Sequence, residues 1–356
     1  MYIPHHLFFG VTFFKCYPIM KPKILFIGGS LNQTTICHAV ARHLETEYDC
    51  YFTPFYTNGL LEVARRLGWL DFSVIGHPRR LKTEAYLREQ GLRMDYGGKM
   101  YDYDLIVMVS DLIIPANVRG KRVILIQEGM TDTETWRYHL VKALHLPRYI
   151  AGTSTTGLSH AYDYFCVASA GYRDLFIRKG VKPGKVLVTG IPNFDNAAQY
   201  LNNDFPYRGY VLIATSDARE TFKLDDRRKF LQWAVNIAGD RPLIFKLHPN
   251  ENKSRAIQEI QDIAPYARIF TDGNTEHMIA NCDALITQYS SCIYNGLALG
   301  KECYSYFDMD MLQRLAPLQN GGSSGYHISL VCRKLLGENL PDPHLIPSKP
   351  MAYSLP

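Results

Sequence analysis

Two short segments in the second half of the chain carry residues suited to holding a phosphate group. In the segment KLHPNE, His248 ends an apolar strand, and Pro249 prevents the strand from continuing, so the imidazole stays at the strand's end. Lys246 lies two residues earlier and points to the same side. Ser290 and Ser291 stand at a helix start, where hydroxyls and free backbone N–H groups can bind one anion. A structural histidine and a simple N-cap are the alternative interpretations of these two motifs.

Two further loops contain groups that can approach an anion. In the segment TSDARET, Arg219 offers a guanidinium that can donate two hydrogen bonds to a phosphate. The loop GGSLNQTT begins with Gly28, Gly29 and Ser30, and its glycines let a ligand approach the backbone at the positive end of the following helix. The loop lacks the G-x-G-x-x-G pattern, so it is not a dinucleotide fingerprint. A solvated helix start and a plain strand-to-helix turn are the alternatives.

Two carboxylates follow apolar strands in the first half of the chain. Glu128 ends the run VILIQ, and Asp111 ends the run LIVMVS. Ligands of open parallel sheets bind beyond the carboxyl ends of the strands, so both acids are candidates for proton transfer in a reaction. We predict Glu128 as a general base and Asp111 as a second catalytic candidate; the alternative is that either carboxylate caps the following helix.

The elements that must position these residues follow one recurring pattern. A short apolar run is followed by a Gly or Ser turn and then by an amphipathic helix. Near-continuous apolar runs are typical of parallel strands that are covered on both faces. The predicted strands are 23–29, 104–111, 122–129, 162–169, 185–195, 210–216, 242–249, 267–272, 283–288 and 302–307, and the predicted helices are 34–44, 170–180, 222–237, 254–263, 275–281, 290–299 and 326–336.

Two successive strand–helix series predict an α/β protein of two doubly wound, Rossmann-like domains with a cleft between them. The first domain spans residues 20–195 and the second spans residues 206–340, with a polar linker between them. Residues 1–19 are interpreted as an extension or an upstream start, and a weak interfacial anchor is the alternative. This stretch is too short to span a bilayer and lacks the basic start and cleavage site of a signal peptide.

The composition excludes several classes of protein. The chain has 356 residues, of which 47% are hydrophobic and 21% charged, and this excludes a disordered or fibrous chain. The formal net charge is only +5 without a Lys/Arg block, so no nucleic-acid partner is expected. The eight cysteines include no C-x-x-C pair, which predicts reduced thiols, a cytoplasmic protein and no metal site. The D-x-D of FDMDML (307–312) is interpreted as a helix start.

The motifs together resemble those of nucleotide-sugar enzymes with the two-domain GT-B fold. VTGIPNFDN (188–196) resembles the link before their second domain, and TSDARET, KLHPNE and TQYSSCIYNGLALGKE follow in the order seen in UDP-N-acetylglucosamine 2-epimerases. QEGM (127–130) falls where that family has an E-A-G-L-R motif, which again selects Glu128. The resemblance covers residues 100–305, and the order and spacing of short motifs carry it.

The chain departs from the epimerases in the last of these motifs. Gln288 stands where they have an aspartate, Ser290 and Ser291 replace glycines, and Tyr294 and Asn295 replace paired glutamates. The carboxylate that the resemblance would place on the nucleotide ribose is therefore missing. The HP and SS elements are instead similar to those of bacterial sialyl- and polysialyltransferases, capsule Kdo transferases and, more loosely, CDP-glycerol glycerophosphotransferases. By this resemblance, the histidine supports the phosphate leaving group and the serine pair holds it.

The resemblance implies a glycosyltransferase that uses a nucleotide-activated sugar in surface polysaccharide or glycoconjugate synthesis. The second domain would bind the donor nucleotide, and the first would bind a carbohydrate or lipid-linked acceptor whose hydroxyl Glu128 deprotonates. No metal or other cofactor is expected. The weak positive charge is compatible with contact to the inner membrane surface. The alternatives are a sugar-nucleotide epimerase, in which Glu128 and Asp111 move protons, and a nucleotide-sugar-binding protein without catalysis.

Overall fold

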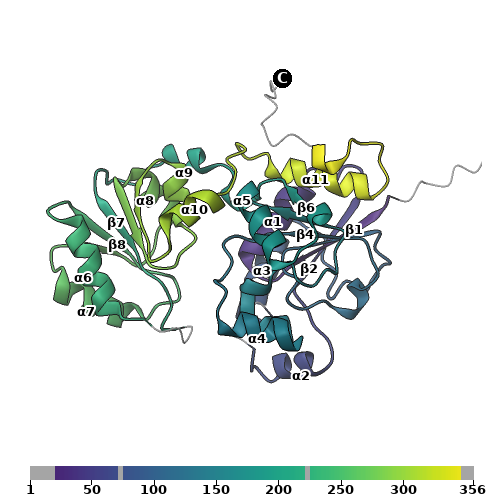
Figure 1. Cartoon of the computed structure of the whole chain (residues 1–356), viewed down its shortest axis with the longest axis horizontal. Helices are drawn as coiled ribbons and strands as arrows, with labels where there is room; N and C mark the ends of the chain where they lie inside the picture. The colour runs from purple at the N-terminus through teal and green to yellow at the C-terminus, as the bar shows by residue number, and fades with distance from the viewer. Residues whose placement is uncertain (1–20, 71–74, 221–224, 346–356) are drawn as a thin grey trace, which may run out of the picture.

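The strands of the computed structural model form two separate parallel sheets (Figure 1). The structure describes residues 21–70, 75–220 and 225–345, so the predicted extension 1–19 lies outside the described residues. The first sheet has the strand order β2-β1-β3-β4-β5-β6 and the second β11-β10-β7-β8-β9. The strands are β1 Lys23–Gly28, β2 Asp49–Pro54, β3 Leu105–Met108, β4 Val123–Ile126, β5 Tyr164–Val167, β6 Val186–Val188, β7 Val211–Ala214, β8 Leu243–Lys246, β9 Arg268–Phe270, β10 Ala284–Thr287 and β11 Glu302–Tyr304. The predicted α/β class with two doubly wound sheets is confirmed.

Helices connect the strands and cover both faces of each sheet (Figure 1). No helix within the described residues is both long enough and apolar enough to cross a membrane. The α-helices are α1 Leu31–Ala41, α2 Leu60–Arg66, α3 His77–Glu89, α4 Trp136–Leu144, α5 Ala170–Lys179, α6 Arg227–Ala238, α7 Lys253–Ile263, α8 Thr275–Asn281, α9 Ile293–Ala298, α10 Met309–Leu315 and α11 Ser324–Leu335. The 3-10 helices are η1 Ala116–Val118, η2 Arg148–Thr155, η3 Pro183–Lys185, η4 Pro192–Phe194, η5 Ala197–Leu201 and η6 Pro343–Leu345.

The central strands are buried on both faces, and this explains why their sequences are nearly continuous runs of apolar residues. All four residues of β3, β4, β7 and β10 are buried. Val211 and Ile213 of β7 belong to a core with α6 and α7, whereas Leu212 faces the opposite side and joins the core that extends into the first sheet. The alternation follows from the two-residue period of a strand. The second sheet is therefore packed between α6 and α7 on one face and α8 and α9 on the other.

The last helix, α11, returns to the first sheet. It packs against α1, and a Cβ atom at Gly325 would lie 2.5 Å from the carbonyl oxygen of Ala39, so only glycine allows this approach. Asp195 fixes the start of α11, because its carboxylate accepts a hydrogen bond from the backbone N–H of Ser324 at 2.8 Å. The predicted second domain, 206–340, includes this helix, whereas the structure places it on the first domain (Figure 1).

Candidate active site between the two domains

A cavity of about 550 Å³ lies between the carboxyl ends of the two sheets. The first domain contributes Glu128, which follows β4, and residues at the start of α1. The second domain contributes Ser290 and Ser291, which follow β10, and Glu276 in the first turn of α8. The lining residues are Asn32, Thr35, Val109, Ser110, Gln127, Glu128, Gly129, Met130, Thr131, Thr153, Thr156, Pro192, Asn193, Phe194, Tyr200, Glu276, Ser290, Ser291, Cys292 and Asn295.

The carboxylate of Glu128 is held at the start of α1 by three side-chain donors. Its Oε2 atom accepts a hydrogen bond from Gln33 Nε2 at 2.7 Å, and its Oε1 atom accepts from Asn32 Nδ2 at 3.1 Å and from Ser30 Oγ at 3.4 Å. The positive end of the helix also favours an anion at this place. A carboxylate offers about four lone-pair sites, so these three bonds fix its orientation and leave room for one further partner.

The first three residues of the glycine loop, Gly28, Gly29 and Ser30, build this support and do not line the cavity. A Cβ atom at Gly28 would lie 2.7 Å from Thr34 Oγ1, so the glycine lets the strand and the helix approach each other. Gly29 donates its N–H to Gln33 Oε1 at 2.8 Å, which orients the amide that binds Glu128. Ser30 caps α1 and donates to the same carboxylate. The anion at this helix start is therefore the protein's own glutamate, and this arrangement does not support the phosphate contacts predicted for Gly28, Gly29 and Ser30.

The serine pair lies in a turn that precedes a short helix. The helix α9 begins at Ile293, three residues later than the predicted start, and contains six residues. Ser290 accepts a hydrogen bond from the Cys292 N–H at 3.4 Å, and the Ser291 hydroxyl has no hydrogen-bond partner among the described residues. Both serines face the cavity that Glu128 lines from the other domain. The dipole of such a short helix is small, so the hydroxyls and turn N–H groups are the principal donors here.

His248 occupies the turn after β8, outside the cavity. The turn is built on Glu251, a buried carboxylate that accepts the His248 N–H at 2.9 Å, binds the Thr215 hydroxyl and pairs with Arg227 at 2.6 Å. The Nδ1 atom of His248 accepts the N–H of Asn250 at 3.3 Å, so the neutral ring carries its proton on Nε2. Asp217, at 3.6 Å from Nδ1, is too distant for a hydrogen bond.

The serine turn and His248 lie on the same edge of the second sheet. β7 separates β10 from β8, and neighbouring strands are ~4.8 Å apart, so the two groups are separated by roughly 10 Å across the edge. The predicted direct grip of one phosphate between His248 and the serine pair is therefore not formed in this structure. A nucleoside phosphate is long enough to contact both positions.

Two other predicted residues, Asp111 and Lys246, are already paired within the protein. Asp111 is buried, and its carboxylate accepts the N–H groups of Gly157 at 3.0 Å and of Ser159 at 3.1 Å. Lys246 is buried and donates to the Leu247 carbonyl at 2.9 Å, and burial lowers the pKa of its ammonium group. These positions do not support a catalytic role for Asp111 or a phosphate contact for Lys246.

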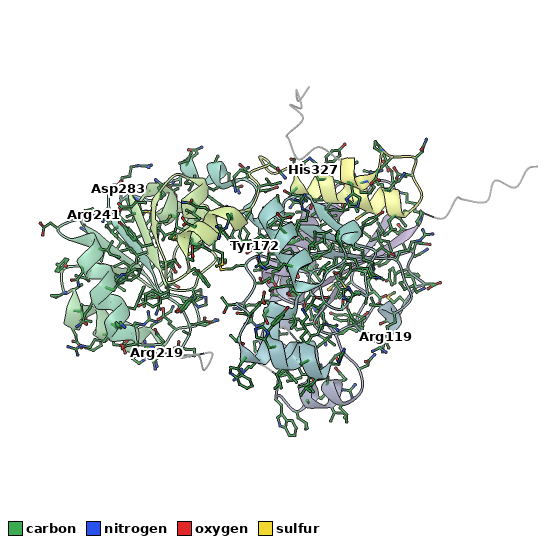
Figure 2. All side chains as sticks on the ribbon, viewed as in Figure 1. Arg119, Tyr172, Arg219, Arg241, Asp283 and His327 are labelled. Atoms are coloured by element: carbon green, nitrogen blue, oxygen red, sulfur yellow. The ribbon has the colours of Figure 1, made fainter. Side chains whose placement is uncertain are left out.

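Arg219 is bound to Glu259 on α7. Its guanidinium donates to both carboxylate oxygens, at 2.7 Å and 2.8 Å, and these hydrogen bonds lower the pKa of Glu259. Figure 2 shows Arg219 at the lower end of the second domain, below Tyr172 at the junction of the domains. The bidentate geometry predicted for Arg219 is therefore present, but it is made with a carboxylate of the protein and not with a phosphate.

Two positions where the chain departs from the epimerase motif have structural partners. Tyr294 on α9 and Tyr172 on α5 join their hydroxyls at 2.9 Å across the buried junction of the domains. Gln288 accepts a hydrogen bond from Ser216 Oγ at 3.0 Å and donates to Asp225 Oδ1 at 2.7 Å. Both side chains therefore hold neighbouring elements together in this structure.

The cavity also contains polar residues that the sequence prediction missed. Glu276 lies in the first turn of α8, after β9, and the rule about strand ends would have selected it if the β9 loop had been considered. Asn32 lies within the predicted glycine loop and Asn193 within the interdomain link, and the two side chains bind each other. Asp308 caps α10, as predicted for the D-x-D segment, and no cluster of three or more metal-binding side chains occurs among the described residues.

The comparisons with known proteins identify the fold. No protein-family model matches the chain, and no curated protein is significantly similar to it. A putative UDP-N-acetylglucosamine 2-epimerase from Listeria monocytogenes is similar in structure with a TM-score of 0.57 and 11% identity, over 90% of this chain and 97% of that one.

Two further solved structures are similar over most of the chain. Another UDP-N-acetylglucosamine 2-epimerase gives a TM-score of 0.52 with 13% identity, over 91% and 99% of the two chains. The wall teichoic acid polymerase TagF gives 0.49 with 12% identity, over 91% of each chain. The two epimerases share the arrangement of both sheets, so the chain has the two-domain GT-B fold that its motifs predicted.

Proposed function

We propose that the protein is a glycosyltransferase that transfers a sugar from a nucleotide-activated donor to an acceptor hydroxyl in the cleft between its domains. The observation that carries this proposal is the placement of Glu128 and the serine pair Ser290–Ser291 on opposite walls of one cavity. A transferase needs a proton acceptor on one side of the anomeric carbon and donors for the leaving phosphate on the other. The fold shared with nucleotide-sugar enzymes is consistent with this proposal.

In the proposed reaction, the free lone-pair site of Glu128 accepts the proton of the acceptor hydroxyl. The acceptor oxygen forms a bond to the anomeric carbon, and the bond from that carbon to the phosphate oxygen breaks, leaving its electron pair on the nucleotide. Ser291, Ser290 and the N–H groups of their turn donate hydrogen bonds to the developing charge. Glu128 then releases its proton to water. Because these hydroxyl and N–H donors stabilise the charge on the leaving phosphate, we propose that no metal takes part and that turnover continues in EDTA.

The substitution Glu128→Gln tests the base directly. General base catalysis contributes about 10²–10⁴-fold, so the variant should lose activity by that factor while it still binds nucleotide. Glu134→Gln is the matched control, because Glu134 is exposed and lies six residues along the same segment. Unchanged turnover of the Glu128→Gln variant would exclude Glu128 as the base.

The nucleotide is identified by thermal shift with CMP, CDP, UDP, GDP and their sugars. A ligand that binds only the native state at 100 times its Kd stabilises the protein by about 2.7 kcal/mol. A double variant, Ser290→Ala/Ser291→Ala, should lose most of the shift, whereas Glu128→Gln should keep it. Binding without turnover of any donor and acceptor would instead indicate a nucleotide-sugar-binding protein without catalysis.

The second candidate function is epimerisation of a sugar nucleotide. It is favoured by one specific observation: two carboxylates from opposite domains, Glu128 and Glu276, line the same cavity. Proton removal and return at one ring carbon requires such a pair. Incubation with UDP-N-acetylglucosamine alone distinguishes the two reactions. An epimerase forms a mannosamine product without any acceptor, whereas the proposed transferase leaves the sugar configuration unchanged.

A further inference from the structure

The cavity between the domains is lined by acidic and uncharged side chains. Glu128 of the first domain and Glu276 of the second both face it, and the described residues that line it include no lysine, arginine or histidine. The other polar side chains on its wall carry hydroxyl, thiol or carboxamide groups. Sites that recognise a carboxylate usually supply an arginine or a lysine for it. The cavity therefore provides no cation for a negatively charged group on a sugar.

The carboxylate of Glu276 has no partner within the described part of the chain. Glu276 is half-buried in the first turn of α8, and it makes no hydrogen bond and no ion pair there, whereas three side chains hold Glu128. Its charge acts through space on Lys246, but Lys246 is buried, donates to the Leu247 carbonyl at 2.9 Å and does not line the cavity. The lone pairs of Glu276 are thus available to O–H or N–H groups of a ligand.

A second polar side chain on the same wall also lacks a partner. Asn295 on α9 is only 4% exposed and lines the cavity, and its carboxamide forms no hydrogen bond with any residue that the structure describes. The helices α8 and α9 pack against each other in the second domain (Figure 1). Buried polar groups are nearly always hydrogen-bonded, so a bound ligand is the missing partner of this carboxamide. A carboxamide both donates and accepts, which matches a sugar hydroxyl.

Tyr200 places a hydroxyl on this wall. It lies in η5 and lines the cavity. Burial is the main cause that raises the pKa of its hydroxyl, and the nearby charge of Glu276 adds to this effect. The phenol therefore keeps its proton and can donate it in a hydrogen bond. Together, the carboxylate, the carboxamide and the phenol suit the hydroxyl groups of an uncharged sugar.

From these observations, we infer that the sugar bound in the cavity is uncharged and that Glu276 excludes sugars that carry a carboxylate. Two like charges brought together in a site without a cation repel each other, and this repulsion selects against the wrong ligand. Sialate and Kdo both carry a carboxylate. The HP and SS elements resemble those of transferases for these two sugars, but the wall around Glu276 disfavours them.

This inference rests on the proposed function, because it takes the cavity as the site of the transferred sugar. Its test measures the binding of donors without an acceptor. Absence of transfer would count against the proposed reaction, whereas equal binding of charged and uncharged sugars would count against the inference. The two failures are therefore separate results.

The test is calorimetric titration of the full chain with UDP-glucose and with UDP-glucuronate. The two ligands have the same nucleotide and differ at C6 of the sugar, where a hydroxymethyl group is replaced by a carboxylate. We expect UDP-glucose to bind at least about tenfold more tightly, because the carboxylate is repelled by Glu276. The ratio of the two Kd values should shrink at high salt, since salt screens charge repulsion and leaves steric exclusion unchanged.

The variant Glu276→Gln removes the charge and keeps the size of the side chain. It should bind UDP-glucuronate about tenfold more tightly than the original chain does, and UDP-glucose a few times more weakly, because a charge-assisted hydrogen bond is lost. Asp240→Asn is the control. Asp240 is exposed and precedes β8, so it lies at the end of the sheet opposite the cavity, and this variant should keep the original ratio.

Three results would overturn the inference. The first is equal binding of the two ligands to the original chain. The second is a preference for UDP-glucose that Glu276→Gln leaves unchanged while the melting temperature shows a folded protein, since the exclusion would then be steric. The third is donor binding that requires Mg²⁺, because the two carboxylates would then hold a cation instead of sugar hydroxyls.

Discussion

The buried pair of tyrosine hydroxyls at the domain junction allows a quantitative prediction. Tyr172 from α5 and Tyr294 from α9 are both buried, and their oxygens lie 2.9 Å apart. The ring of Phe194, in the interdomain link, packs edge-on against Tyr294 at 6.0 Å between centroids. Replacing either tyrosine with phenylalanine keeps the ring and removes one hydroxyl. The other hydroxyl then stays buried without this partner.

An unsatisfied buried polar group costs about 1–3 kcal/mol, whereas removal of both partners of a hydrogen bond can be nearly neutral. We therefore expect each of Tyr172→Phe and Tyr294→Phe to lower the free energy of unfolding by about 1–3 kcal/mol. At ~2–4 °C per kcal/mol for a chain region of 150–250 residues, the melting temperature falls by about 2–12 °C. Tyr172→Phe should cost more, because the Thr131 backbone also interacts with the Tyr172 hydroxyl.

The double variant tests whether the hydroxyls of Tyr172 and Tyr294 bond each other. If the two hydroxyls satisfy each other, the double variant Tyr172→Phe/Tyr294→Phe should lose no more stability than Tyr172→Phe alone. The double-mutant cycle of these variants should then give a coupling energy of about 0.5–3 kcal/mol. Urea and thermal unfolding of the four proteins measure this coupling. Tyr266→Phe is the control, since Tyr266 is exposed and its hydroxyl has no partner among the described residues. Strictly additive losses would show that the two hydroxyls do not interact, and the described junction would be refuted.

Three further predictions concern single residues. Glu251→Gln should destabilise the second domain by about 1–3 kcal/mol, because it removes the carboxylate that pairs with the buried Arg227 and accepts the His248 N–H, while Asp225 still pairs with Arg227; chemical denaturation measures this loss, and an unchanged free energy of unfolding would contradict it. Gly28→Ala should cost about 1–3 kcal/mol by crowding Thr34, and a calorimetric melting temperature equal to that of the original chain would show that the helix can shift. Glu259→Gln should lower the melting temperature at neutral pH. Hydrogen bonds from Arg219 lower the pKa of Glu259 in the folded protein, so the stabilisation by this carboxylate is present above its unfolded-state pKa and is lost as pH falls through the folded-state pKa. The melting temperatures of the variant and the original chain should therefore converge as the pH falls below about 4.5. A difference in melting temperature that grows in acid would contradict this prediction.

The sequence predicted the sheets well and selected three residues that line one cavity, because both inferences depend on local pattern. Apolar runs of four to six residues with a following turn identify parallel strands, and the carboxyl ends of those strands select the loops that bind ligands. Glu128 and the serine pair were selected in this way, and the structure brings them to one cavity. The predicted helix 275–281 agrees with α8 at both ends, and the side chain of Asn274 caps it by accepting the His277 N–H.

The remaining site predictions depend on partners that lie far away in the sequence. Arg219 was predicted to bind phosphate because of its type and its place in a loop, but Glu259, forty residues later, occupies the guanidinium. Asp111 was considered catalytic, but its two carboxylate oxygens accept the backbone N–H groups of Gly157 and Ser159. Such pairings depend on tertiary packing, so the local sequence pattern around either residue cannot predict them.

Several elements were missed for a related reason. β2, at Asp49–Pro54, forms the edge of the first sheet, and its sequence DCYFTP is not a continuous apolar run. Its partly buried residues alternate with buried ones, because an edge strand is less covered than a central strand. α3, at His77–Glu89, has few apolar residues and buries mainly Thr83, Glu84 and Leu87, so it gives only a weak amphipathic signal.

The packing of α11 on α1 has a consequence for how the chain folds during synthesis. The strands of the first sheet are complete at Val188, but the helix that covers α1 ends only at Leu335. A ribosome must therefore translate the whole second domain before the first can bury Ile328, Val331 and Cys332. Until then, the emerging chain exposes an apolar groove to chaperones and to neighbouring nascent chains. Emergence of α11 from the ribosome, and not completion of the first sheet, is therefore the step at which this domain becomes closed.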